Sequence, residues 1–144
     1  MKSKHIGVKR KAYSAKTCSD TNIIISAALS DTGNPSIIFK MISDGKLHLC
    51  YNAQILSEYT DVLSRDKFNF SPEKQKTFVD KIVEIGIVVN TVSSDISLPD
   101  ESDRVFYDTA KACKGVLITG NTKHYPNEPF IFTPKDFLKT LCGE

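Results

Sequence analysis

The stretch that decides the fold lies near the N-terminus and reads Asp20-Thr21-Asn22-Ile23-Ile24-Ile25-Ser26-Ala27-Ala28-Leu29. Asp20 is a residue type that caps helices, and the apolar run behind it predicts a buried helix over residues 21–29. A carboxylate in this place can be a cap and nothing more, or it can belong to a site that the fold assembles. The choice depends on which other polar side chains fall at comparable places along the chain.

Helix-like and strand-like segments alternate along the rest of the chain. Asn34 is expected to cap a helix whose first residue is Pro35 and which ends at Gly45. The alternation of the remaining segments predicts an α/β fold, in which a mostly parallel central sheet of about five strands is flanked by helices in three layers. Further helices are expected over 52–64, 71–85, 100–114 and from 133 onward, and strands over 47–51, 87–89, 116–119 and 129–132.

Four polar positions fall where such a sheet would present a site. Ligands of parallel α/β sheets bind beyond the carboxyl ends of the strands, and Asp20 and Asn121 lie there in this prediction. Asp103 falls in the first turn of a predicted helix. Glu58 lies about 40° from Val62 on a helical wheel, at the border of an apolar helix face. Carboxylates gathered by the fold would bind a hard divalent cation through oxygen atoms, which makes metal-assisted phosphodiester hydrolysis the first hypothesis.

Each of these positions also has a purely structural explanation. Asp20 or Asp100 could be an N-cap, because carboxylates at a helix start bind free backbone N–H groups. Asp103 could be only an acid in a first helical turn, where it interacts favourably with the helix dipole. Glu58 could pair with a Lys or Arg side chain. Thr119-Gly120-Asn121 could form only a turn. The site hypothesis therefore depends on the order and setting of all four positions together.

The composition is that of an ordinary soluble globular chain. With 144 residues, 40% hydrophobic and 25% charged, the chain is long enough to bury the core of one domain. No apolar run approaches the roughly 18 residues of a membrane span, and the N-terminus lacks the apolar region of a secretory signal. The cysteines show no Cys-x-x-Cys spacing, and Cys50 and Cys113 are expected to be buried thiols. A cytoplasmic location fits these features.

The net charge of +2 is unevenly distributed along the chain. Residues 1–17 carry six of the 19 Lys and Arg residues and no acid, which leaves 13 basic and 17 acidic side chains, a net charge of −4, over residues 18–144. The body of the chain is therefore not a general polyanion-binding surface. Residues 1–12 are expected to form a poorly ordered basic arm that could touch nucleic acid, ahead of a single α/β domain over residues 13–144.

Four segments, in this order, carry a resemblance to a known family. Together they resemble the PIN domain, and within it the bacterial subgroup of toxin components of toxin–antitoxin pairs. The resemblance covers about residues 20–138. The segments are the stretch 20–29 quoted above, Ser57-Glu58-Tyr59 with Val62-Leu63-Ser64-Arg65, Asp103-Arg104-Val105-Phe106-Tyr107, and Leu117-Ile118-Thr119-Gly120-Asn121-Thr122-Lys123-His124-Tyr125-Pro126.

The resemblance implies an endonuclease of single-stranded RNA that depends on Mg²⁺ or Mn²⁺ and is held inactive by an antitoxin protein. It carries over the catalytic acids Asp20, Glu58 and Asp103. It implies that these three acids and Asn121 bind the metal. The residues expected to contact RNA are Asn22, Thr119 and Asn121. A homodimer is a further expectation, and no membrane association is expected.

The chain departs from the family pattern in two places. The family often has a fourth acid where this chain has Asn121, whose carbonyl oxygen can bind a metal but carries no charge. The family has an apolar central strand before the first acid, whereas this chain has Tyr13-Ser14-Ala15-Lys16-Thr17-Cys18-Ser19. A lysine is out of place in a strand that is buried on both faces. We therefore expect a poor first strand.

Two other functions follow from the same residues. A catalytically degenerate PIN-like domain would bind partners or RNA without cleaving, and the weak first strand and Asn121 favour it. A phosphoacceptor α/β domain would use Asp20 as its acceptor, but the chain lacks a lysine in the expected setting after a late strand. Metal-dependent cleavage that disappears on removal of Asp103 would distinguish the enzyme from the binding domain.

Overall fold

The computed structural model describes residues 15–142, so the basic arm expected over residues 1–12 lies outside the described part of the chain. Five parallel strands form one sheet in the order β3-β2-β1-β4-β5. This arrangement confirms the predicted parallel α/β sheet. The strands are β1 (Lys16–Ser19), β2 (His48–Tyr51), β3 (Ile87–Val88), β4 (Val116–Ile118) and β5 (Ile131–Phe132).

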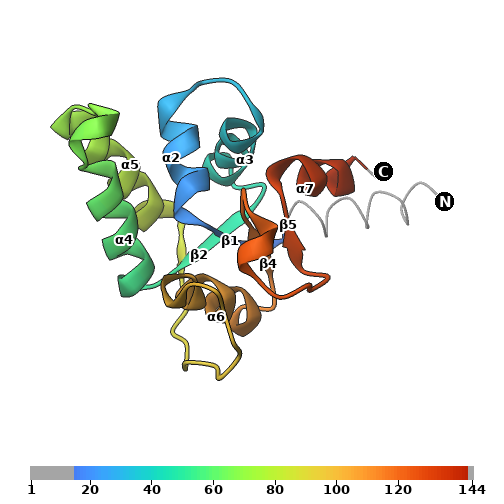
Figure 1. Ribbon diagram of the computed structural model, residues 1–144. Helices are drawn as coiled ribbons and strands as arrows, with labels where there is room; N and C mark the ends of the chain where they lie inside the picture. Colours follow the sequence, from blue (N-terminus) through green and yellow to red (C-terminus); the bar gives the residue numbers. More distant parts are fainter. Residues whose placement is uncertain (1–14, 143–144) are drawn as a thin grey trace.

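Helices cover both faces of the sheet and complete the predicted three layers. Helix α6 lies on one side, and α2, α3 and α7 lie on the other (Figure 1). Three short 3-10 helices occur in the connections: η1 (Asp66–Phe68), η2 (Glu101–Asp103) and η3 (Thr122–His124). The α-helices are α2 (Thr21–Leu29), α3 (Asn34–Ser43), α4 (Ala53–Leu63), α5 (Pro72–Ile85), α6 (Arg104–Ala112) and α7 (Pro134–Leu141).

Strand β1 is the central strand even though its sequence is polar. Lys16 is exposed at the start of the strand, in register with His48, whereas the next three residues are buried. The expectation of a lysine inside a buried strand is therefore wrong. Thr17 donates a hydrogen bond from Oγ1 to the carbonyl of His48 at 3.0 Å, which satisfies its hydroxyl. The buried Oγ of Ser19 has no hydrogen-bond partner within residues 15–142, so the strand carries one uncompensated polar group.

Two helix starts differ from the sequence prediction. Helix α3 already includes Asn34, and the capping position is Gly33, whose φ of 102° lies in a region that L side chains rarely adopt. The prediction that Asn34 is the cap is wrong by one residue. The helix expected over 100–114 is divided into η2 and α6, and Asp100 caps it by accepting a hydrogen bond from the backbone N–H of Ser102 at 3.0 Å.

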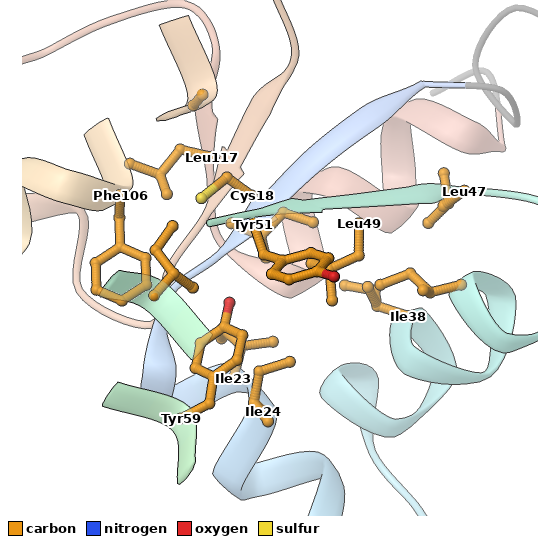
Figure 2. Close-up of a cluster of buried hydrophobic side chains, with 14 of the residues drawn as sticks. Cys18, Ile23, Ile24, Ile38, Leu47, Leu49, Tyr51, Tyr59, Phe106 and Leu117 are labelled. Atoms are coloured by element: carbon orange, nitrogen blue, oxygen red, sulfur yellow. The ribbon is translucent and has the colours of Figure 1, made fainter. Parts of the chain in front are cut away.

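The main core lies between the sheet and the helices on both of its faces, and it includes buried side chains from α2, α3 and α4 and from α6 and α7. Figure 2 shows Tyr59 and Phe106 in this core, and their rings stack with 6.3 Å between the ring centres. The thiols of Cys50 and Cys113 are buried and free, as predicted. None of the helices within residues 15–142 is both long and apolar enough to cross a bilayer.

The sheet order places a ligand site between β1 and β4. The chain leaves β1 toward β2 through α2 and α3, and it returns from β3 to β4 through α6 on the opposite face (Figure 1). Connections between parallel strands are right-handed. The connection from β1 to β2 and the connection from β3 to β4 run in opposite directions along the sheet, so their helices lie on opposite faces. Loops therefore diverge at the carboxyl ends of β1 and β4, which is where ligands bind in such sheets.

Candidate acidic site at the ends of strands β1 and β4

A cleft of about 540 Å³ opens at these strand ends. It brings together the three acids that the sequence singled out, although they lie far apart along the chain. The basic side chains of the cleft come from the segment after α4 and from η3. The cleft is lined by Asp20, Thr21, Asn22, Glu58, Asp61, Val62, Arg65, Lys67, Phe68, Asp100, Ser102, Asp103, Asn121 and His124.

Asp20 follows β1 directly and is held by hydroxyl groups. Its Oδ2 accepts hydrogen bonds from Thr119 Oγ1 at 2.9 Å and from Tyr125 Oη at 3.3 Å. Its other oxygen caps α2 weakly, at 3.5 Å from the backbone nitrogen of Asn22. Burial raises the pKa of the Tyr125 hydroxyl above its usual range, so this group remains a donor at neutral pH. Asp20 is thus both a cap and a side chain fixed toward the cleft.

Glu58 reaches the cleft from α4. It accepts a hydrogen bond from the hydroxyl of Thr21, the first residue of α2. The next residue, Tyr59, is fully buried and donates from its hydroxyl to the backbone carbonyl of Ser19 at the end of β1. These two contacts anchor α4 against the β1–α2 junction. The half-buried place predicted for Glu58 at the border of an apolar face is the place that it occupies.

Asp103 is the most deeply buried acid of the cleft, with 9% of its surface exposed. Burial and the nearby charge of Asp20 raise its pKa to about 6. Its Oδ2 lies 3.4 Å from Nδ1 of His124, but the geometry is not that of a hydrogen bond, and this buried oxygen has no such partner in the described chain. Asp103 is therefore a carboxylate whose charge the described protein atoms compensate only in part.

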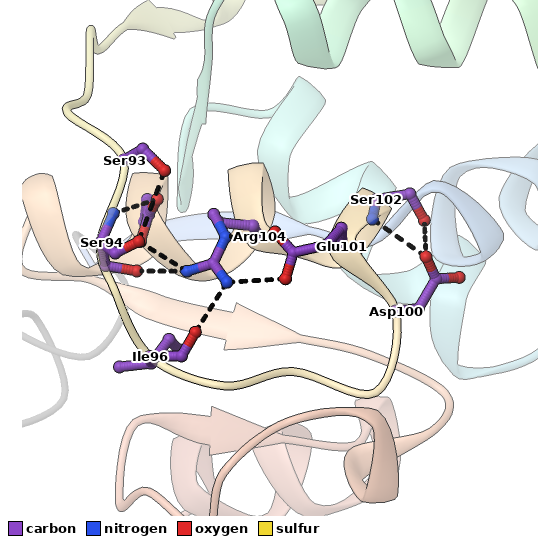
Figure 3. Close-up of polar contacts among 8 residues, drawn as sticks. Ser93, Ser94, Ile96, Asp100, Glu101, Ser102 and Arg104 are labelled. Carbon is purple, nitrogen blue, oxygen red and sulfur yellow. Dashed lines mark hydrogen bonds and ion pairs between the residues drawn. The ribbon is translucent and has the colours of Figure 1, made fainter.

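A polar network fixes the backbone on which Asp103 is placed. Figure 3 shows the Arg104 guanidinium between the segment before η2 and η2 itself. It donates to the carbonyls of Ser94 at 2.7 Å and Ile96 at 2.6 Å, and it forms an ion pair with Glu101 at 2.7 Å. Only 15% of this side chain is exposed. Arg104, the residue next to Asp103, is thus held by three residues, which gives the acid a defined position.

The residues expected to contact RNA lie in different settings. Asn22 and Asn121 are exposed and line the cleft, whereas Thr119 is fully buried. The Thr119 hydroxyl donates to Asp20 and accepts from the backbone N–H of Asn121 at 3.1 Å. Thr119 therefore positions Asp20 from the buried side of the cleft and does not face the solvent. The side-chain oxygen of Asn121, Oδ1, accepts a hydrogen bond from the backbone N–H of Lys123 at 3.2 Å, and Asn121 caps η3. The turn considered for this segment is therefore present.

The donor atoms of the cleft fit a hard divalent cation in type but do not form a closed cage. The candidate ligands are all oxygen atoms, the kind that Mg²⁺ and Mn²⁺ prefer. One of them, Oδ2 of Asp103, is buried without a hydrogen bond from residues 15–142. No three His, Cys, Asp or Glu side chains of the described chain form a group arranged to hold one metal ion. A metal bound here would need the acids to draw closer or water to complete its shell.

Sequence reasoning missed two contributors to the site. Tyr125 supplies the second hydroxyl on Asp20, and Thr21 supplies the hydroxyl on Glu58. Both residues lie within the segments that carry the family resemblance, but neither residue type suggests a role by itself. The signal available in the sequence was the presence of hydroxyl side chains in the same segments as the acids.

Comparison with known proteins gives one match. A family model of the PIN domain matches residues 16–123, which is more than half of the chain. The chain belongs to the PIN domain family, whose members are generally nucleases. No significant match was found among curated proteins or among solved structures.

Proposed function

We propose that this protein is a metal-dependent endonuclease of single-stranded RNA and the toxin of a toxin–antitoxin pair. The observation that supports this most strongly is Asp103, a buried carboxylate beside Asp20 with an oxygen that accepts no hydrogen bond from the described chain and has only His124 nearby, at 3.4 Å. Burying such a group costs free energy unless something compensates the charge. In a family of nucleases, a divalent cation is the compensation that also serves the reaction.

Asp20, Glu58 and Asp103 are the catalytic acids of this proposal, and with the Asn121 carbonyl they would hold Mg²⁺ or Mn²⁺. A bound divalent cation lowers the pKa of an attacking water and offsets charge on the phosphoryl oxygens. The remaining work falls to the protein. The Thr119 hydroxyl keeps Asp20 in one orientation. The loss of such contacts would let the acids separate under their mutual repulsion.

The positions of Asn22 and Asn121 support a role in binding substrate. Both are exposed on the cleft, next to the acids, and both carry amide groups that can donate to phosphate or base edges. The family resemblance supports single-stranded RNA as the substrate, an antitoxin protein as the partner and a cytoplasmic location. A homodimer is part of the same proposal.

The second candidate function is a PIN domain that binds partners or RNA without cleaving. Two observations favour it. The described acids do not form a preformed metal cage. The fourth position is an amide whose oxygen already accepts a backbone hydrogen bond. In this case the cleft would bind ligands with no need of a metal.

The deciding experiment measures cleavage of a labelled single-stranded RNA with Mn²⁺ by the wild type, Asp103→Asn and Asp100→Asn. Asp100 lies on the rim of the same cleft and caps η2, a role that asparagine retains. The proposal predicts cleavage that is abolished by Asp103→Asn and retained by Asp100→Asn. Equal loss in both variants would mean that only the summed charge of the cleft matters. Metal-independent RNA binding without cleavage by the wild type would establish the second candidate.

A further inference from the structure

One wall of the cleft is basic and aromatic. The chain leaves α4, passes through η1 and enters α5, and this connection places Arg65, Lys67 and Phe68 on the cleft that holds the acids. Asn69 ends η1 in a left-handed conformation, with φ 54°. This turn fixes the direction of the two residues before it. We call Lys67 and Phe68 the lip of the cleft.

The lip has a fixed base and a free surface. Phe68 is half-buried and packs against a small second core made of α2 and α4 residues, while the rest of its ring is accessible. Lys67 is exposed, and its Nζ lies 5.1 Å from the centre of the Phe68 ring. The aromatic ring is thus supported from below by the small core, and an exposed cation lies over it at a distance typical of a weak cation–π contact.

The cations of this wall are available to an anion. Arg65 pairs with Asp61 at 3.3 Å, but both side chains are more than half exposed, so water weakens this pair. Lys67 makes no ion pair with any residue of 15–142. The cleft is therefore lined by acids, at Asp20 and Asp103, which we call its acidic end, and by the basic and aromatic residues of the connection after α4. A polyanion whose reacting phosphate sits at the acidic end needs a compensating cation further along the strand.

We propose that the lip is a nucleotide-binding subsite, in which Lys67 contacts a phosphate of the RNA and the Phe68 ring stacks on the base of the nucleotide beside the cleaved bond. Stacking on a side chain requires a base that is not paired, so the lip selects single-stranded over double-stranded RNA. This inference rests on the proposed function, because it takes the acidic end as the place where the phosphodiester reacts. The two residues are positioning residues for the substrate.

The chain contains a matched control for the lip. Phe70 stacks on Phe68 at 5.9 Å between ring centres, packs against the same small core, and has Lys74 Nζ over its ring at the same 5.1 Å. Neither Phe70 nor Lys74 lines the cleft. The two aromatic–lysine pairs thus share chemistry and packing and differ in their access to the site.

The experiment measures the Kd of a fluorescent single-stranded RNA and of an RNA duplex of equal length with a chelator present, so that metal-dependent cleavage cannot proceed. Phe68→Leu is expected to weaken single-strand binding about tenfold, the loss of one stacked base, and to leave duplex binding nearly unchanged. Lys67→Gln is expected to weaken both and to lower the salt dependence of single-strand binding by about 0.7, one phosphate contact. Phe70→Leu, which removes a neighbour of the Phe68 ring but no residue of the cleft, should weaken single-strand binding much less than Phe68→Leu. Lys74→Gln should change neither the single-strand nor the duplex affinity.

Equal effects of Phe68→Leu and Phe70→Leu would overturn the subsite, because the loss would then follow from packing. Thermal melts identify a leucine variant that does not fold. In that case the test is the RNA affinity of Lys67→Gln, which changes an exposed side chain, compared with that of Lys74→Gln. Cleavage with Mn²⁺ is measured separately. Binding that depends on the Phe68 ring without any cleavage would retain the subsite and remove the nuclease proposal. Cleavage that Asp103→Asn abolishes, with binding indifferent to Phe68 and Lys67, would overturn the subsite alone.

Discussion

The surroundings of Asp20 and of Asp103 differ sharply, although both acids face one cleft. Asp20 lies at the end of the central strand and receives hydrogen bonds from Thr119, Tyr125 and the backbone of Asn22. Asp103 lies at the start of α6, is more deeply buried, and has one oxygen without a hydrogen bond in the described chain. The first acid is bound into the protein, and the second is left to be compensated by something else.

This difference separates the structural role of an acid from its functional role. Removal of a satisfied acid leaves buried donors without an acceptor, which costs stability. Removal of an acid that is compensated only in part relieves an unfavourable charge, which adds stability while it removes function. The two acids should therefore respond in opposite directions to substitution.

The largest effect is expected for Asp20→Ala, which should lower the free energy of unfolding by about 2–3 kcal/mol. The change leaves the hydroxyls of Thr119 and Tyr125 without their acceptor and removes the cap of α2. Denaturant unfolding measures the loss. Asp20→Asn, which keeps an acceptor oxygen and a capping side chain, should cost less than half as much. Equal losses in both variants would show that the charge of Asp20, and not its hydrogen bonds, stabilises the fold.

Asp103→Asn is expected to raise the free energy of unfolding at pH 8 without metal by about 1 kcal/mol. Burial and the charge of Asp20 raise the pKa of Asp103 to about 6, so its carboxylate is ionised at pH 8 and is unfavourable in the folded state. The expected gain in the free energy of unfolding is smaller than the full pKa shift would give, because solvent screens part of the repulsion. Asp100→Asn serves as the control for a nearby acid with satisfied hydrogen bonds. A loss of stability in Asp103→Asn would place this residue with Asp20 as a structural acid.

The same comparison predicts a pH dependence. The folded-state pKa of Asp103, about 6, lies above the value of about 3.9 for an unfolded chain. The folded state therefore binds the proton more tightly, and the contribution of Asp103 to stability is fully present below pH 4 and is lost as the pH rises through 6. The difference in stability between Asp103→Asn and the wild type should grow between pH 4 and 7 in unfolding curves. A difference that is constant with pH would contradict the raised pKa.

The smallest effect is expected for Tyr125→Phe, which removes the longer of the two hydroxyl contacts to Asp20. At 3.3 Å this bond is weak, and Thr119 still donates at 2.9 Å. We expect a loss of about 0.5 kcal/mol in thermal or denaturant unfolding. Thr119→Val, which removes the shorter bond and is close in shape, should cost more. The reverse order would show that Tyr125 is the main support of Asp20.

The fold was predictable from the sequence because most of its elements follow local rules. Proline and capping residues mark the starts of the helices, as at Ser71-Pro72 and Thr133-Pro134, and short apolar runs mark β2 and β4. Strand β1 was less predictable because its burial comes from its place between two neighbours and not from its own side chains. The exposure of Lys16 depends on register, which a sequence does not reveal.

The sequence predicted which acids form the candidate site, but it did not predict which of them receive hydrogen bonds from the protein. The order and setting of Asp20, Glu58, Asp103 and Asn121, together with the family resemblance, predicted that they lie in one place, and all four line one cleft. Which acid is satisfied depends on side chains that arrive from distant elements, such as Tyr125 at 105 residues from Asp20. The lip formed by Lys67 and Phe68 was missed for the same reason, since its meaning appears only when the connection after α4 meets the cleft.

The central claim is that Asp103 is compensated by a divalent cation, and thermal melts of the wild type and Asp103→Asn with and without millimolar Mn²⁺ at pH 8 test it most directly. Binding to the folded state raises the Tm by mass action. We predict that the variant melts higher than the wild type without metal, and that Mn²⁺ raises the Tm of the wild type alone, so that the difference narrows or reverses. Equal shifts in both proteins, or none in either, would contradict the claim.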